Sequence, residues 1–290
     1  MVPTDTGMNS VELDVGTIHY RESGSGPPIV FAHGLLVNGT LWRKVTPLLE
    51  DRFRCIIPDL PLGSHREPMK PDAELTPPGV ARIVADFMAA LDLRDATLVG
   101  NDTGGAISQI VAANHPERLG GLVLTPCDAY ENFLPPAFRP MQYAAKVPGL
   151  LTVLVQPVRL RAIQRSPLAF GMLISPQNVD ADVLDAWVRP YLNDSGIRRD
   201  TTKFLRSISN RYTIEAAEKL RSLDRPTLIA WAPEDRFFKL RFAERLASEI
   251  PDARLVRIEN SRTFVSEDQP ERLAEEIASF VSGSVKTAAK

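Results

Sequence analysis

The stretch TLVGNDTGGAISQ, residues 97–109, decides the fold of this chain. An apolar lead-in is followed by small residues and then by a segment of helical composition, which predicts a strand, a tight turn and a helix with Asp102 at the turn. Gly100, Gly104 and Gly105 let the backbone fold tightly, so that a side chain at the apex stands clear of the sheet. An α/β enzyme presents a nucleophile in this way, whereas the plainer interpretation is an Asp that caps a helix.

The segments around this turn alternate between apolar runs of strand length and longer stretches of helical period. The runs at 29–32, 55–58, 96–99 and 122–124 are almost entirely apolar, which is typical of parallel strands covered by helices on both faces. Between 130 and 220 many prolines break the sequence into short amphipathic helical pieces, and the alternation resumes afterwards. We therefore predict an α/β core domain over 1–129 and 221–290, with an inserted helical cap over 130–220.

Composition limits the classes of partner. The chain has 290 residues, 34 basic and 36 acidic side chains in mixed order, and a formal net charge of -2, so we expect no nucleic acid and no membrane partner. No apolar run reaches the roughly 18 residues that span a bilayer, and the first residues lack the pattern of a signal peptide, which indicates a cytoplasmic protein. Four scattered histidines and the lack of a Gly-rich dinucleotide motif predict no metal and no cofactor. A homodimer is compatible with the sequence.

Outward from Asp102, the order of segments over roughly residues 11–283 resembles the α/β-hydrolase superfamily. The resemblance implies an α/β-hydrolase fold, with a mostly parallel eight-stranded sheet, helices on both faces and an inserted helical cap. The strand PPIVFAHG ends in His33 and Gly34, which look like the oxyanion-hole motif of the family. The backbone N–H groups of Leu35 and Thr103 are then implied to bind developing negative charge, while the histidine of this motif usually braces loops.

The nucleophile position holds Asp102 instead of serine, which resembles the haloalkane dehalogenase and epoxide hydrolase branch. A carboxylate is ionised near neutral pH and can displace a halide or open an epoxide directly, which leaves an alkyl ester on the enzyme. In this branch a histidine after the last strand activates the water that cleaves the ester, and a carboxylate orients that histidine. The segment WAPEDRFF implies Asp235 as this carboxylate, with Glu234 and Asp128 as weaker candidates.

The histidine itself is missing. Alignment of IENSRTFVSEDQPERLAEEI with the Gly-His-Phe ending of the family places Thr263 at the base position, and no histidine follows His115. Thr103 stands where dehalogenases carry a halide-binding tryptophan, and the His-Gly motif lacks the proline that commonly follows it in epoxide hydrolases. The side chains therefore support neither substrate class.

Two substitutes for the missing base are open. His65, in the loop PDLPLGSHREPM, could approach Asp102 from the opposite side. Alternatively, burial under an apolar cap could raise the pKa of Asp102 and make it a general acid or base, which the helix N-terminus opposes.

Three functions follow from these alternatives. The first is an α/β-hydrolase-fold enzyme that acts on a small apolar substrate through Asp102, with Asp235 as a second acid. The second is a non-hydrolytic lyase, cyclase or isomerase that uses Asp102 as acid or base, and the third is a ligand-binding protein impaired in catalysis.

Aromatic residues and methionines of the cap could line an apolar pocket above Asp102, although most of them are expected in the core. They are Tyr130, Phe133, Phe138, Met141, Tyr143, Phe170, Met172, Trp187 and Tyr191. Cap tyrosines of epoxide hydrolases donate to the substrate oxygen, and Tyr143, Tyr191 or Tyr212 could do so here.

Overall fold

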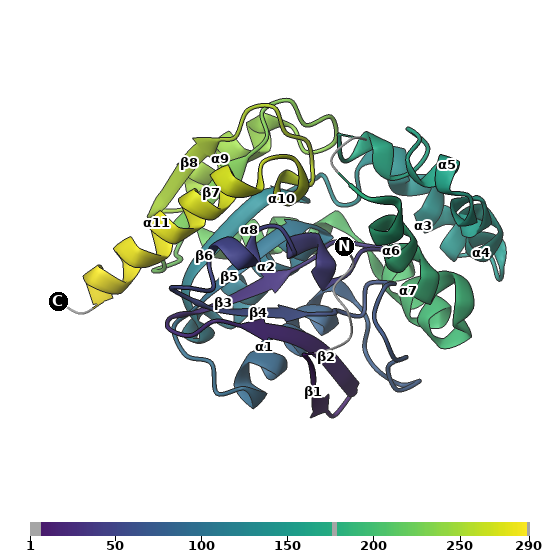
Figure 1. Cartoon of the computed structure of the whole chain (residues 1–290), viewed down its shortest axis with the longest axis horizontal. Helices are drawn as coiled ribbons and strands as arrows, with labels where there is room; N and C mark the ends of the chain where they lie inside the picture. The colour runs from purple at the N-terminus through teal and green to yellow at the C-terminus, as the bar shows by residue number, and fades with distance from the viewer. Residues whose placement is uncertain (1–6, 176–178, 289–290) are drawn as a thin grey trace.

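The computed structural model describes residues 7–175 and 179–288, and it contains one eight-stranded sheet in the order β1-β2-β4-β3-β5-β6-β7-β8 (Figure 1). β1 pairs antiparallel with β2, and β2 with β4, whereas all later neighbours are parallel. The strands are β1 Met8–Leu13, β2 Gly16–Ser23, β3 Pro28–Ala32, β4 Arg54–Pro58, β5 Ala96–Asp102, β6 Leu119–Cys127, β7 Thr227–Trp231 and β8 Ala253–Arg257. The predicted mostly parallel α/β sheet is confirmed.

Helices cover the sheet on both faces. α1 contacts α2, and α2 contacts α8, while α11 packs on β6 and β7; in Figure 1 the yellow α11 crosses in front of the sheet and α2 and α8 lie behind it. The helices of the core are α1 Pro77–Ala90, α2 Thr103–Asn114, α8 Asn210–Leu220, α9 Leu240–Glu249, α10 Val265–Asp268 and α11 Pro270–Ala288. The central strands are buried on both sides, which explains their continuous apolar sequence.

The carboxyl ends of the parallel strands lie at one edge of the sheet. Gly34 follows β3, Asp102 ends β5, Asp128 follows β6, Asp235 follows β7, and Thr263 lies beyond β8. Ligands of open α/β sheets bind outside this edge. Five segments that are far apart in the sequence are thereby gathered at one place.

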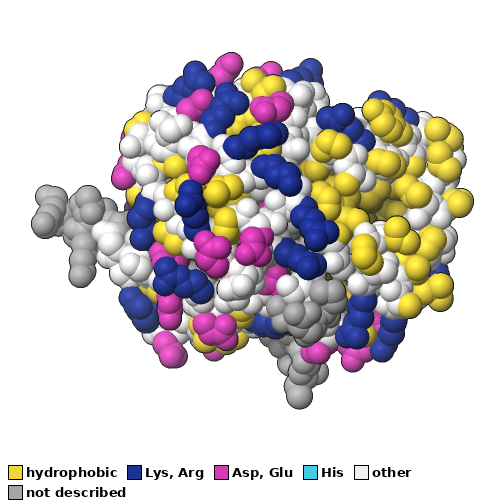
Figure 2. Space-filling model, turned by 90° about the horizontal axis from the view of Figure 1, so that it is seen from above, with side chains coloured by type: hydrophobic (Ala, Val, Ile, Leu, Met, Phe, Trp, Pro, Cys, Tyr) yellow, Lys and Arg dark blue, Asp and Glu magenta, His cyan; other side chains and the backbone are white. Residues whose placement is uncertain are grey.

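The cap is inserted between β6 and β7 and lies on the right in Figure 1. Its helices are α3 Arg139–Ala145, α4 Leu150–Val155, α5 Arg161–Gln164, α6 Ala181–Asn193 and α7 Ser195–Ser207. α8 falls within the range 130–220 that was predicted as the cap, and it packs against α2 of the core. Figure 2 shows hydrophobic side chains gathered over the cap around a hollow. Within the described residues, no helix is long and apolar enough to cross a membrane.

Candidate active site

Asp102 occupies a strained turn between β5 and α2. Its φ of 54° and ψ of -131° belong to a region that residues with a side chain rarely adopt and that clusters at functional sites. Gly34 is required beside it, because a Cβ atom there would lie 2.1 Å from Oδ2 of Asp102. The backbone N–H of Leu35 donates to the same oxygen at 3.3 Å. The turn and the loop after β3 therefore fix the direction of the carboxylate.

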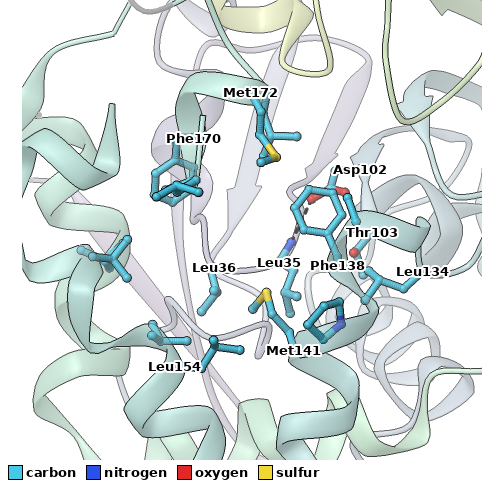
Figure 3. A pocket seen from close by; sticks show the side chains of 18 residues that line it. Leu35, Leu36, Asp102, Thr103, Leu134, Phe138, Met141, Leu154, Phe170 and Met172 are labelled. Atoms are coloured by element: carbon cyan, nitrogen blue, oxygen red, sulfur yellow. Dashed lines mark hydrogen bonds between the residues drawn. The ribbon is translucent and has the colours of Figure 1, made fainter. Parts of the chain in front are cut away.

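The carboxylate of Asp102 faces a largely apolar pocket of about 270 Å³ (Figure 3). The floor comes from Leu35, Leu36 and Thr103, and the cap supplies the walls. Cap side chains that line it include Leu134, Phe138, Met141, Leu154, Leu168, Phe170 and Met172. Among the described residues that line this pocket, Asp102 is the only one that ionises. A ligand in the pocket would therefore meet one reactive group in apolar surroundings.

The surroundings of Asp102 raise its pKa to about 7. Burial has the largest effect, and the charge of Asp235 adds to it, while the backbone N–H groups of Leu35 and Thr103 act in the opposite direction. The sequence left this sign open, and the balance falls on the side of burial. Both the carboxylate and the carboxylic acid are thus populated at neutral pH.

Asp235 and Thr263 form a hydrogen-bonded pair at the same edge of the sheet. The hydroxyl of Thr263 donates to Oδ2 of Asp235 at 2.6 Å, and the N–H groups of Phe237 and Phe238 both donate to Oδ1 at 2.7 Å. Asp235 and Thr263 are buried. Burial raises the pKa of Asp235, and these three donors partly offset the rise. Thr263 thus contacts the acid that the sequence resemblance implies would orient a histidine, but a hydroxyl cannot accept a proton from water as an imidazole does.

Asn101 is a site residue that the sequence analysis missed. Its side-chain amide donates to the carbonyl of Thr263 at 2.7 Å, to the hydroxyl of Thr125 at 2.8 Å and to the carbonyl of Pro126 at 3.1 Å. It therefore ties the loop after β8 to the ends of β5 and β6. In the sequence, the only indication that Asn101 belongs to the site is its position directly before Asp102. That position does not predict its hydrogen bonds to Thr263, Thr125 and Pro126.

Asp128, a weaker candidate in the sequence, lies behind Thr103 and does not line the pocket. It is fully buried, and the hydroxyl of Thr103 is 3.5 Å from its Oδ2. Its Oδ1 has no hydrogen-bond partner among the described residues. Burial, and next the charge of Asp102, raise the pKa of Asp128 well above its usual value. A neutral acid is therefore the form that this position favours.

The two histidines near the site have structural partners. Nδ1–H of His33 donates to the carbonyl of Gly34 at 2.9 Å, and its Nε2 accepts from the N–H of Leu60 at 2.8 Å. Burial lowers the pKa of His33 to about 4, so the ring stays neutral and braces two loops, as the resemblance implied. Nε2 of His65 lies 3.3 Å from Oδ2 of Asp200 in α7. Neither ring lines the pocket that contains Asp102.

The cap residues divide between pocket and core. Phe138, Met141, Phe170 and Met172 line the pocket. The other five candidates from the cap do not line it: Tyr130, Phe133, Tyr143, Trp187 and Tyr191. Trp187 is buried between the rings of Phe170 and Phe264, and its Nε1–H donates to Thr40 at 2.7 Å.

The three tyrosines proposed as donors are placed elsewhere. Tyr143 is 60% exposed on the outer face of the cap, and Tyr191 is buried among core side chains. The hydroxyl of Tyr212 pairs with Arg211 at 2.6 Å. None of the three lines the pocket, so the structure offers no tyrosine donor of the epoxide hydrolase kind there. The described residues also contain no group of three or more potential metal ligands.

Comparison with known proteins identifies the family of this chain. The chain matches the α/β hydrolase fold family over residues 27–270, and it belongs to that family. It is 27% identical over 263 residues to an uncharacterized hydrolase of Bacillus subtilis (strain 168), covering 91% of this chain and 92% of that protein. It is 28% identical over 268 residues to haloalkane dehalogenase 2 of Mycobacterium tuberculosis (strain ATCC 25618 / H37Rv), covering 89% of each.

Solved structures show the same fold. The haloalkane dehalogenase of Bradyrhizobium elkani superposes with a TM-score of 0.80 at 21% sequence identity, over 98% of this chain and 99% of that chain. At this identity the likeness concerns the fold alone, because one fold hosts many functions. The chemistry must be argued from the residues of the site.

Proposed function

We propose that this protein is a hydrolase-type enzyme in which Asp102 attacks a small apolar substrate. One observation carries the proposal: Asp102 is the ionisable residue of an otherwise apolar pocket, on a strained turn, with one carboxylate oxygen held by the N–H of Leu35. The names of two relatives, a hydrolase and a haloalkane dehalogenase, support a hydrolase as the class of enzyme.

In the first step, an oxygen of the ionised Asp102 forms a bond to a saturated carbon of the substrate while the bond from that carbon to its leaving group breaks. The leaving group departs with the electron pair, and an alkyl ester remains on Asp102. In the second step, water adds to the carboxyl carbon of the ester and loses a proton to solvent, and the N–H groups of Leu35 and Thr103 stabilise the oxyanion. The bond from the carboxyl carbon to the alkoxy oxygen then breaks, this oxygen takes up a proton, and the product alcohol leaves a regenerated Asp102.

The second step is expected to be slow. Thr263 and Asp235 form a hydroxyl–carboxyl pair where related enzymes place a histidine and its acid, so no imidazole activates the water. General-base catalysis of this kind contributes about 10²–10⁴-fold to a rate. The ester should therefore accumulate.

Intact-protein mass spectrometry tests this proposal. After incubation with a bromoalkane or an alkyl epoxide, we expect the mass of the protein to increase by the alkyl-containing group. Asp102→Asn, which keeps the shape of the side chain but lacks the nucleophile, should show no increase. The same adduct on Asp102→Asn, or product formed by that variant at the unaltered rate, would refute the role of Asp102.

A second function is favoured by a specific observation. A carboxyl group with a pKa of about 7 is suited to donate or accept a proton at neutral pH, as a lyase, cyclase or isomerase would require. Turnover without any covalent adduct, lost in Asp102→Asn, would support this alternative. Saturable binding without turnover would instead indicate a binding protein.

A further inference from the structure

The outer face of the cap is unusually apolar. Seven of the nine large hydrophobic side chains that are exposed in the described residues lie between residues 143 and 168. They are Tyr143, Val147, Leu150, Val153, Leu154, Leu160 and Leu168, and together we call them the cap patch. Most monomeric proteins expose apolar side chains singly, and a contiguous group of this kind marks an interaction surface.

The cap patch reaches the pocket. Leu154 and Leu168 line the pocket, and they are also 47% and 80% exposed. Figure 2 shows hydrophobic side chains on all sides of the hollow in this part of the molecule. α4 contributes apolar residues to both sides of the wall, because Leu151 and Val155 are buried while Val153 is 67% exposed. A surface that covers the cap patch would therefore lie directly at the pocket entrance.

The charge around the cap patch is mainly positive. Residues 132–179 contain no Asp or Glu, and they contain five basic residues, all of them exposed: Arg139, Lys146, Arg159, Arg161 and Arg165. Asp182 and Asp185 of α6 pair with Arg161. Arg159 and Arg165 instead donate to uncharged groups, the side chain of Gln156 and the carbonyl of Val179. The net charge of the whole chain is nearly balanced, and on that ground the sequence predicts no membrane partner. The total charge hides this local excess of basic residues.

We propose that the cap patch docks on an anionic lipid surface, with the pocket entrance facing the lipid. Exposed aliphatic side chains would enter the boundary between headgroups and acyl chains, and the surrounding cations would contact lipid phosphates. An apolar substrate dissolved in the lipid could then reach the pocket without crossing water.

A second copy of the chain fits this face less well. In a two-fold dimer the same patch meets itself, so the cations around one cap patch would face those around the other. An anionic surface satisfies both the apolar and the charged parts of the patch, and a second copy satisfies only the apolar part.

Vesicle co-sedimentation tests the proposal, and it requires no assumption about the chemistry of Asp102. We expect the protein to sediment with vesicles of phosphatidylcholine and phosphatidylglycerol, and to do so much less with phosphatidylcholine alone or in high salt. The double variant Val153→Glu/Leu160→Glu should weaken binding by roughly tenfold or more, since it removes two aliphatic contacts and adds negative charge. Neither residue lines the pocket.

A matched control separates this effect from a general change of surface. Leu48→Glu/Ile214→Glu replaces the two exposed aliphatic residues outside the cap patch, and it should bind like the unaltered protein. Thermal unfolding checks that both double variants are folded. The proposal is overturned if the unaltered protein does not sediment with anionic vesicles, or if the two double variants bind the vesicles equally. It is also overturned if the only effect of Val153→Glu/Leu160→Glu is to dissociate a dimer.

Discussion

The turn at Asp102 and the position of Thr263, called the base position here after the proposed mechanism, lie at the same edge of the sheet, yet they differ in how completely they are equipped for the hydrolysis that we propose. The turn has a positive φ at Asp102, a close glycine at 34 and an N–H donor from Leu35. The base position has a well-bonded acid, Asp235, but its partner is the hydroxyl of Thr263. In the proposed mechanism, the turn thus supplies what ester formation needs, whereas the base position offers no imidazole for ester cleavage.

The largest effect is expected from Thr263→His. An imidazole at this position could donate a ring N–H to Asp235, which would orient it with its other nitrogen free to take a proton from water, and ester cleavage should accelerate by about 10²–10⁴-fold. The decay of the alkyl adduct, followed by intact mass, measures this rate. Thr263→Gln is the control of similar bulk. If the adduct decays at the same rate in both variants, the proposal that ester cleavage is slow for want of an imidazole at position 263 is contradicted.

The pH dependence of ester formation is expected to be the next largest effect. Only the ionised Asp102 attacks, and its pKa is raised to about 7. The rate of adduct formation should therefore fall about tenfold per pH unit below 7 and level off above it. A rate that instead falls as the pH rises above 7 would indicate that the carboxylic acid is the active form.

Asp102→Asn should stabilise the fold at alkaline pH. The folded-state pKa of Asp102 is about 7, above its usual 3.8, so the folded chain holds more protons than the unfolded chain between these values. The contribution of this group to stability therefore falls as pH rises from about 4 to about 7. We expect Asp102→Asn to raise the free energy of unfolding by about 2 kcal/mol near pH 8 and by much less near pH 4. Urea unfolding at both pH values measures this, and an equal gain at both would contradict it.

Thr263→Val should destabilise the base position. It removes the donor to Oδ2 of Asp235, a buried oxygen, and such a loss costs about 1–2 kcal/mol. Thr263→Ser keeps the hydroxyl and should retain most of the stability. If Thr263→Val and Thr263→Ser have the same free energy of unfolding in urea, the hydrogen bond to Asp235 makes no measurable contribution to stability.

The smallest effect is expected from His65→Gln. His65 contacts Asp200 and does not line the pocket, so the decay of the adduct on Asp102 should change by less than about twofold. Gln keeps a polar side chain at this buried position. A loss of ester cleavage in this variant would make His65 the substitute base.

The sheet could be predicted from the sequence because its central strands are buried on both faces, so that strand-length apolar runs such as 96–99 stand out. The turn at Asp102 was predictable for a different reason, since glycines and small polar residues between an apolar run and a helical segment favour a tight turn. The contact between α8 and α2 was not predictable, because the amphipathic period of α8 is the same whether it packs on the cap or on α2.

The segments that form the candidate site could be predicted from their order along the chain. The direction in which individual cap side chains point could not. Tyr143 and Met141 lie in the same short helix, yet one is 60% exposed and the other lines the pocket. Short helices between prolines carry too little pattern to fix which face turns inward. The pKa of Asp102 depends on the competition between its burial and the backbone N–H donors around it. Neither the burial nor the donors can be read from the sequence.

The cap is fastened to the core unevenly. Trp187 of α6 bonds to Thr40, and Asp200 of α7 accepts from the N–H of Met69 at 2.7 Å, whereas the segment from α3 to α5 provides most of the pocket wall. Helices α6 and α7 thus carry side-chain hydrogen bonds to the core, and the pocket wall overlaps with such attachments near residues 170–174, where the carbonyls of Gly171 and Ile174 accept from Arg262. A library that varies residues 134–169 while leaving these attachments intact should recover folded proteins with altered ligand range, which makes this segment a natural unit for exchange between relatives.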